Sequence, residues 1–357
     1  MSENWLIQKV LTQDFALSTE LYLMGTYILR RVLMVIPILI LVSFLSFVFI
    51  RLIPGDPAMI LLGDRAPQAE VEKYKEQMGL NQPVYVQYFR FMAKAVQGDM
   101  GKSIVTRVPV MDEIAYRLPA TIEAIIFALI IGITVGVSMG VLAAVKRNTV
   151  IDTIANLVAL LGVAMPVFWL ALVLIYLFGV YLKILPPGAR IDANIVIPRI
   201  TGFYLVDSLI AGRTDWFVSA LKHMVMPSFV LSTTVMPSIM RLTRASMLEV
   251  LRTDYIRTAR AKGLRQGSVI FKHTLRNALL PVITTIGLQV GGLLGGAILT
   301  ENAFSWTGMG QWFFGAISRR DYPVLQAAIM FNAGIFVIMT MLVDISYAFI
   351  DPRIRYK

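Results

Sequence analysis

The 357-residue sequence has no cysteine, only two histidines and few charged residues. Without cysteine, the chain cannot form a disulfide, a thiolate metal site or a cysteine nucleophile, although this absence does not reveal the compartment. His223 and His273 have no cysteine or carboxylate at metal-ligand spacing, and the sequence contains no G-x-S-x-G motif of a serine hydrolase. We therefore expect neither a catalytic site nor a metal site, and we expect both histidines to lie at a membrane interface.

The scarcity of charge indicates a membrane protein. Charged residues make up 15% of the chain and hydrophobic residues 57%, with a mean hydropathy of +0.70. Such a composition is typical of an all-helical integral membrane protein. The net charge of +11 is compatible with nucleic acid binding, but the basic residues flank apolar runs, which favours a role in membrane orientation and argues against nucleic acid as a partner.

Six apolar runs are candidates for transmembrane helices. A helix needs roughly 20 residues to cross the hydrocarbon core. Five runs meet or approach this length, and a sixth is shorter and contains two prolines, but basic residues at its ends can reach the interface. The first run is too long for the core of a cleaved signal peptide. The predicted spans cover residues 32–50, 124–145, 153–182, 224–240, 278–300 and 322–343.

Basic residues in short loops predict the orientation of these spans. Arg30 and Arg31 precede the first span, Lys146 and Arg147 follow the second, and the chain ends in a basic segment. All three fall on one side, together with residues 241–277, which contain nine basic and two acidic residues. We therefore expect both termini to be cytoplasmic. Loops 51–118, 183–217 and 301–321 are then extracytoplasmic.

The string GDMGKS at 98–103 resembles the end of a phosphate-binding P-loop, but it fails the full pattern. The first glycine of G-x-x-x-x-G-K-[ST] should stand at position 96, which is Val96, and no apolar strand precedes it. We interpret it as a glycine-rich turn in a folded extracytoplasmic subdomain, and PGDP at 54–57 as a turn that leaves the first span. Glu123 and Asp344 are predicted near the ends of spans, which argues against a stand-alone ion-coupled carrier.

A basic segment, TARAKGLRQGSVIFKHTLRNALLP at 258–281, stands between two apolar runs. It predicts a helix over 246–262, a turn at Gly263 and a second helix over 266–280. Ala259, Ala261 and Gly263 are small, so another protein could approach the backbone closely, while nearby arginines could pair with acidic groups on that partner. The alternative is an ordinary basic loop with no docking role.

Several motifs together resemble the B-type membrane subunit of dipeptide/oligopeptide ABC importers. They are RLIPGDP at 51–57, GDMGKS at 98–103, RLPAT at 117–121 where the second span begins, DYIRTARAKGL at 254–264, LRNALLP at 275–281 and DPRIR at 351–355. The resemblance covers roughly residues 27–357. The sequence departs from the general permease motif at Arg257, where that motif has glutamate.

This resemblance implies the type I ABC importer permease fold. The implied organisation is an N-terminal extension over 1–26, a first transmembrane helix over 27–51, an extracytoplasmic subdomain over 52–118 and a permease core over 119–357 with a coupling segment at 246–280. The subunit would be non-catalytic and lie in a bacterial or archaeal cytoplasmic membrane. Its implied partners are a C-type permease, two ABC ATPases that bind ATP and magnesium, and an extracytoplasmic binding protein.

The resemblance also implies two sets of site residues. The ATPase-coupling residues would be Asp254, Tyr255, Arg257, Ala259, Arg260, Ala261, Lys262 and Gly263. The substrate path would include Met165, Phe168, Trp169, Gln289 and Gly292. Glycines 287, 291, 292, 295 and 296 would allow close helix packing or a hinge. Related permeases are expected to carry dipeptides, longer peptides, glutathione, nickel complexes or oligosaccharides, so the motifs leave the substrate open.

Overall fold

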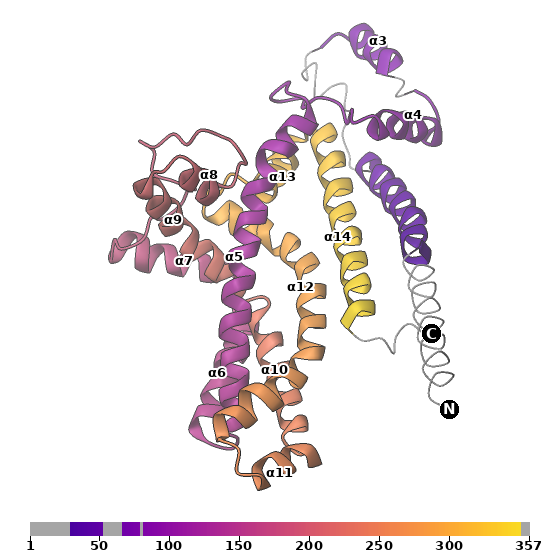
Figure 1. The fold of residues 1–357 in the computed structure, drawn as a ribbon. Coiled ribbons are helices and arrows are strands. Elements are labelled where there is room, and N and C mark those ends of the chain that lie inside the picture. Colours follow the sequence, from indigo (N-terminus) through magenta and orange to yellow (C-terminus); the bar gives the residue numbers. More distant parts are fainter. Residues whose placement is uncertain (1–28, 53–65, 79–80, 351–357) are drawn as a thin grey trace, which may run out of the picture.

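The computed structural model describes residues 29–52, 66–78 and 81–350, and helices account for most of these residues (Figure 1). The predicted extension over 1–26, the PGDP turn and the DPRIR end lie outside the described residues. The helices are Leu29–Leu52, α3 Gln68–Met78, α4 Val84–Val96, α5 Val110–Val145, α6 Val150–Ala164, α7 Val167–Leu174, the π-helix η1 Ile175–Tyr181, α8 Tyr204–Ile210, α9 Thr214–Ser232, α10 Met236–Val250, α11 Asp254–Ala261, the π-helix η2 Ser268–Leu275, α12 Arg276–Ala303, α13 Met309–Arg319 and α14 Tyr322–Ile350.

The 36-residue helix α5 runs along most of the molecule and is about 54 Å long at about 1.5 Å per residue (Figure 1). It packs mainly against α10 and α9. Gly132, Gly136 and Gly140 repeat at intervals of four, which places them on one helical face. A Cβ at Gly140 would lie only 2.6 Å from Thr243 Cβ, so glycine permits this close approach of α5 and α10.

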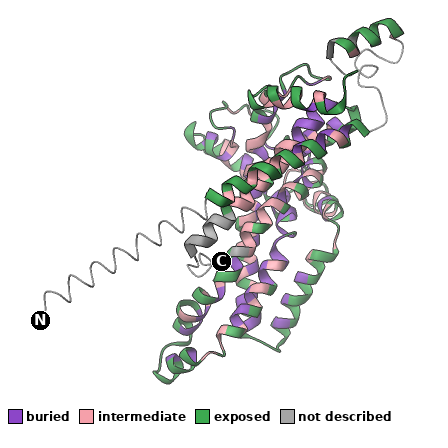
Figure 2. Ribbon diagram, turned by 90° about the vertical axis from the view of Figure 1, so that its right-hand side faces the viewer, coloured by how far each residue is buried: buried purple, intermediate pink, exposed green. Residues whose placement is uncertain are grey.

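Three described helices are long and apolar enough to cross a membrane by themselves: Leu29–Leu52, α5 and α14. Three further spans are possible in the described residues if each bent helix pair counts as one. Many large apolar side chains are exposed on the helices, and the buried residues lie mostly where helices face one another (Figure 2). This distribution is what a lipid-facing bundle requires.

The prediction of one continuous helix over 153–182 is wrong. The chain bends by 104° between α6 and the α7–η1 pair. Pro166 lacks a backbone N–H, and Met165 before it adopts an extended conformation with φ −79° and ψ 126°. The break therefore follows from the proline.

The predicted span over 224–240 also differs from the structure. Helix α9 begins ten residues earlier, at Thr214, and a 57° bend separates it from α10. At this break, the hydroxyls of Thr233 and Thr234 donate to the carbonyl oxygens of Val230 and Leu231. Pro237, which has no N–H to donate, lies in the first turn of α10.

The second predicted span begins earlier than the sequence indicated. Helix α5 starts at Val110, so the RLPAT motif and the predicted domain boundary at 118–119 fall inside it. Pro119 does not interrupt α5. The loop before α8 covers this part of the helix, because a Cβ at Gly202 would lie 2.9 Å from Pro119 Cγ.

Candidate functional site

The basic segment lies at the end of the bundle where α11 joins α10 to η2 (Figure 1). The predicted helix over 246–262 is wrong, because the chain forms two helices, α10 and α11, with a turn between them. Thr253 has the extended conformation φ −72° and ψ 151°, and its hydroxyl donates a 2.6 Å hydrogen bond to Val250 O. A threonine hydroxyl bonded to a nearby carbonyl oxygen competes with the backbone hydrogen bonds of a helix, which favours a turn here. Helix α11 can therefore point in a direction different from α10.

One face of α11 is buried. Ile256 and Ala259 are 0% and 8% exposed, and both pack in a cluster with Val269 of η2. The spacing of three residues places both side chains on the inner face of α11. Ala259 therefore helps to attach α11 to η2, and the interpretation of Ala259 as part of an exposed docking surface is wrong.

Gly263 ends α11 in a left-handed conformation. Its φ is +75°, its N–H donates to Arg260 O, and the N–H of Leu264 donates to Ala259 O. This pair of bonds is the Schellman motif, which favours glycine. A Cβ at Gly263 would meet nothing within 4 Å. Glycine is thus required by the backbone angle, and open space remains beside it.

The outer face of α11 is exposed and basic. We call it the α11 surface and define it as the exposed residues Asp254, Tyr255, Arg257, Arg260, Ala261, Lys262 and Gly263. Arg257 lies 3.3 Å from Asp254, but both side chains are largely in solvent, so this pair contributes little. Arg260 and Lys262 project from the last turn and the cap of α11. Seven of the eight predicted coupling residues therefore share one exposed surface.

Two apolar side chains in the segment after α11 are exposed. Phe271 of η2 and Leu264 after the turn are 64% and 43% exposed. An exposed aromatic ring among basic residues is typical of protein interfaces. Tyr255 of the α11 surface is held by a hydrogen bond. Its hydroxyl accepts a 2.9 Å hydrogen bond from Asn277 Nδ2 at the start of α12.

One basic residue of segment 241–277 is used inside the bundle. Arg244 of α10 donates to both carboxylate oxygens of Asp152 in α6, at 2.7 Å each. Asp152 is buried and also accepts bonds from Asn148 N and Asn156 Nδ2. The two charges are 92 residues apart, and nothing in the sequence pattern paired them. This ion pair fastens α6 to α10.

The predicted substrate-path residues lie on two regions that contact each other. Met165 is the C-cap of α6 at the 104° bend, and Phe168 and Trp169 are exposed in the first turn of α7. Gln289 and Gly292 lie in α12, which packs against α7. Among the described residues, no hydrogen bond joins the two groups, so their role as a path stays a prediction.

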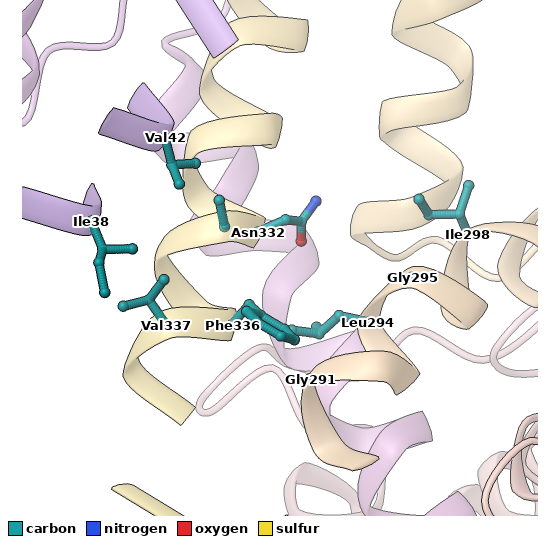
Figure 3. A pocket seen from close by; sticks show the side chains of 10 residues that line it. Ile38, Val42, Gly291, Leu294, Gly295, Ile298, Asn332, Phe336 and Val337 are labelled. Carbon is teal, nitrogen blue, oxygen red and sulfur yellow. The ribbon is translucent and has the colours of Figure 1, made fainter. Parts of the chain in front are cut away.

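The glycines of α12 have different surroundings. Gly291 packs against the ring of Phe336 in α14 so closely that a Cβ would overlap it, and Gly296 faces Leu231. A Cβ at Gly292 or Gly295 would meet nothing within 4 Å. The close-packing role therefore applies to Gly291 and Gly296. Figure 3 shows the apolar cavity beside Gly291 and Gly295, of about 460 Å³, between α12, α14 and Leu29–Leu52.

A buried ion pair joins Arg190 to Glu123 in the N-terminal half of α5, away from the basic segment. Arg190 Nη2 donates to Glu123 Oε2 at 2.8 Å and to Gly202 O at 3.1 Å. The guanidinium also stacks 3.7 Å from the ring centroid of Tyr204. Glu123 was predicted near the end of its span, but α5 extends 13 residues beyond it, from Val110. Its charge is thus compensated within the protein.

Glu301 of α12 binds the N-terminus of α13. Its Oε2 accepts hydrogen bonds from the N–H groups of Gly310 and Gln311, and its Oε1 accepts a 2.5 Å bond from Thr121 of α5. These are helix N-terminal N–H groups, which favour a negative charge. A Cβ at Gly308 would overlap this carboxylate. Glu301 was not predicted as a functional residue, and the G-x-G pattern at residues 308–310 was the sequence signal for its close contact with α13.

The GDMGKS segment forms a turn that is anchored by Asp321. Gly98 and Gly101 both have φ of +86°. Ser103 Oγ donates a 2.6 Å hydrogen bond to Asp321 Oδ2, and the N–H groups of Ile104 and Val105 donate to the same carboxylate. A phosphate would need donors of this kind, and here a buried carboxylate occupies them. This geometry agrees with the interpretation as a turn.

Asp207 and His223 are two further buried polar groups. Asp207 of α8 is buried, which tends to raise its pKa, but hydrogen bonds from Thr201 and the N–H groups of Gly202 and Ile200 outweigh this effect, and the pKa of Asp207 is lowered. His223 was predicted at an interface, but it is buried in α9. Its Nδ1 lies 2.8 Å from Ser219 O.

Comparison with known proteins connects this fold to transporters. Residues 132–356 match the family described as "Binding-protein-dependent transport system inner membrane component", and residues 24–125 match the corresponding N-terminal family. The "Dipeptide transport system permease protein DppB" of Alkalihalophilus pseudofirmus is 47% identical over 93% of this chain and 100% of its own length.

Two other relatives cover similar lengths. The "Di/tripeptide transport system permease protein DppB" of Pseudomonas aeruginosa is 45% identical over 94% of this chain and 100% of its own length. The "Oligopeptide transport system permease protein AppB" of Bacillus subtilis is 40% identical over 93% of this chain and 100% of its own length. The chain therefore belongs to the family of binding-protein-dependent transport system inner membrane components.

Proposed function

We propose that this chain is a permease subunit of an ATP-driven importer of dipeptides or oligopeptides and forms half of the path across the membrane. The observation that carries this proposal is the full-length similarity to permeases whose names state dipeptide or oligopeptide transport. The family description itself refers to a binding protein and an inner membrane. The subunit is multi-pass and non-catalytic, with up to six spans in the described residues when each bent pair counts as one.

The orientation rests on charge. The basic residues of segment 241–277 and of the α5–α6 turn lie at the same end of the bundle, and short basic loops remain on the cytoplasmic side. We accordingly assign the α11 surface and both termini to the cytoplasm. The opposite end, with α8, α13 and the GDMGKS turn, then faces outward, where a binding protein would deliver substrate.

Coupling to two cytoplasmic ATPases would take place at the α11 surface. Arg257, Arg260 and Lys262 are exposed and have no buried acidic partner among the described residues, so acidic groups on an ATPase could pair with them. Phe271 would supply an apolar anchor. ATP and magnesium would bind to the ATPases, and their closure would move α11 and rock this subunit against a C-type permease.

An ion-driven carrier acting alone is the rival function. Such a carrier needs an ionisable group free to exchange its ion within the membrane. Two acids buried along the spans, Glu123 and Glu301, are instead held by Arg190 and by the donors of Thr121 and α13. This arrangement favours the ATP-driven function.

The deciding experiment reconstitutes the chain in liposomes with and without its ATPases, C-type permease and binding protein. We expect uptake of a labelled dipeptide only with the complete set and ATP, and competition with a longer peptide, nickel complexes, glutathione and oligosaccharides would define the substrate class. Uptake by the chain alone, driven by an ion gradient, would support the rival instead.

Docking is tested by co-purification of the ATPases with a tagged permease. Ala261→Trp places a large ring on the α11 surface without changing a special backbone angle, so we expect lost association and lost uptake. Ala93→Trp, the same change at an exposed position of α4 at the other end of the bundle (Figure 1), is the matched control and should leave association unchanged. Normal association of the Ala261→Trp variant would contradict docking at this surface.

A further inference from the structure

Eight residues between the α11 surface and α12 form a π-helix. In η2, Ser268–Leu275, the backbone bonds join residues five apart, whereas an α-helix joins residues four apart. Gly267 and Arg276 at its ends have ordinary helical angles, so η2 continues directly into α12. Most π-helical segments are single turns and many occur at functional sites. A segment of this length at this position therefore needs a physical explanation.

Thr274 provides one. Its side chain is fully buried, and its Oγ1 donates a 2.8 Å hydrogen bond to Val269 O, five residues earlier. A threonine in an α-helix bonds to the carbonyl three or four residues earlier. Thr285 in α12 does so with Pro281 O at 3.1 Å. The hydroxyl of Thr274 thus supports the register of the π-helix specifically.

Both sides of η2 are packed. Val269 joins Ile256 and Ala259 of α11, while Ile270 joins a cluster with Met247 of α10 and Ala278 of α12. A change of helical register in η2 therefore cannot leave both contacts unchanged. It must move α11 relative to α12.

A second connection crosses η2. Asn277, in the first turn of α12, donates from Nδ2 to Tyr255 OH at 2.9 Å and to His273 O at 3.0 Å. Asn277 and Tyr255 are exposed, so the hydrogen bond between them can break and re-form with water as a substitute. The apolar contact at Val269 is then the firmer link between α11 and the rest of the bundle.

We propose that η2 is a hinge with two helical registers and that Thr274 is the positioning residue that holds the π register. Conversion of η2 to an α-helix would change the register by one residue, which corresponds to a rotation of about 100° and a shift of about 1.5 Å. Rotation of α11 against α12 would follow. This proposal rests on the proposed function, in which ATPases bind the α11 surface and could favour one register over the other.

The first test separates the hydroxyl of Thr274 from its shape, using the reconstituted complete transporter. Thr274→Val keeps the shape and removes the hydrogen bond, which should change the ratio of the two registers by about fivefold. We expect a similar loss of peptide uptake per ATP hydrolysed. Thr274→Ser retains the hydroxyl and should restore most of the uptake. Thr285→Val, which removes a hydroxyl with an ordinary α-helical bond, is the matched control.

Co-purification keeps the two proposals distinguishable. If ATPases bind the Thr274→Val variant normally while uptake per ATP falls, both proposals stand. If the ATPases fail to bind even the unaltered chain, the proposed function fails. Normal uptake by Thr274→Val, or equal loss in Thr274→Ser and Thr274→Val, would overturn the hinge, because the hydroxyl would then have no role.

The second test measures the movement. The chain has no cysteine, so spin labels can be placed at Thr258→Cys in α11 and Ile283→Cys in α12, both exposed positions. We expect their distance to differ between the nucleotide-free and vanadate-trapped complex. A control pair at Arg241→Cys and Glu249→Cys, both in α10, should not change. An unchanged distance between α11 and α12 in a complex that hydrolyses ATP would overturn the hinge.

Discussion

Arg199 Nη2 donates a 2.5 Å hydrogen bond to Ala115 O, 84 residues earlier in the chain. Ala115 is four residues before Pro119, and proline has no N–H to donate to that carbonyl. Arg199 thus supplies the hydrogen bond that Pro119 cannot make. Its guanidinium also lies 4.5 Å from the ring centroid of Tyr116. The loop before α8 therefore helps α5 to remain a continuous helix at Pro119.

This relationship predicts the outcome of a double-mutant cycle. Arg199→Met should lower the unfolding free energy by about 1 kcal/mol because Ala115 O loses its donor. Pro119→Ala restores the helical N–H, so the cost of Arg199→Met should shrink in that background. Thermal unfolding in detergent measures all four proteins. Equal costs in the two backgrounds would show that Arg199 does not act through Pro119.

Asp321 should be important for the fold of residues 98–109. Asp321→Ala leaves Ser103 Oγ and two backbone N–H groups without their acceptor, and hydrogen bonds to charged groups contribute about 1.5–3 kcal/mol. We expect faster proteolysis within residues 98–109 and a lower unfolding temperature. Asp99→Ala is the control, since Asp99 accepts only an exposed bond from Gly101 N. Similar proteolysis of both variants would contradict the anchoring role of Asp321.

Two glycines in α13 should respond oppositely to alanine. A Cβ at Gly310 would lie 2.5 Å from Ile298 Cα and would also disturb the Glu301 carboxylate, so Gly310→Ala should destabilise the protein. Gly315 lies in the same helix with nothing within 4 Å. Gly315→Ala should stabilise α13 by up to about 1 kcal/mol through helix propensity. Unfolding temperatures compare the two, and destabilisation by both would point to a general intolerance of α13.

Membrane orientation can be measured with single cysteines. Val105 and Ser268 are exposed, whereas Ser103 is buried against Asp321 and unsuitable for labelling. Val105 belongs to the segment before α5 and Ser268 to the segment after α11, and Figure 1 shows these segments at opposite ends of the bundle. An impermeant maleimide added to spheroplasts should label Val105→Cys and leave Ser268→Cys unlabelled until the membrane is opened. The unaltered, cysteine-free chain is the background control. Reversed labelling would overturn the proposed orientation.

Charge reversal at the α11 surface should weaken ATPase association in a salt-dependent way. Arg260→Glu and Lys262→Glu remove attraction to acidic groups and add repulsion, so co-purification should fall most at low ionic strength. Exposed charges are largely screened beyond about 10 Å at about 0.1 M salt. Lys94→Glu, an exposed change at the other end of the bundle, should have no effect. An equal loss at all salt concentrations would indicate that these residues act through packing.

Much of the membrane organisation was predictable from the sequence because it depends on local composition. Apolar runs located the first and last spans, and the helices Leu29–Leu52 and α14 include the predicted runs as far as the described residues extend. Gly263 was correctly predicted to end α11, since a left-handed helix end favours glycine. In the sequence, Pro166 also indicates a break. The prediction relied on hydropathy and therefore joined α6 and α7 into one span.

Only the tertiary structure decided which distant groups meet. Arg199 with Ala115, Ser103 with Asp321, Arg244 with Asp152 and Glu301 with Thr121 are separated by long stretches of sequence, and no local pattern pairs them. The same limit explains Ala259, whose small side chain suits either a docking surface or a buried contact until η2 is packed against it. Local sequence sets which segments are helical and apolar, whereas hydrogen-bond partners and burial depend on how those helices pack in three dimensions.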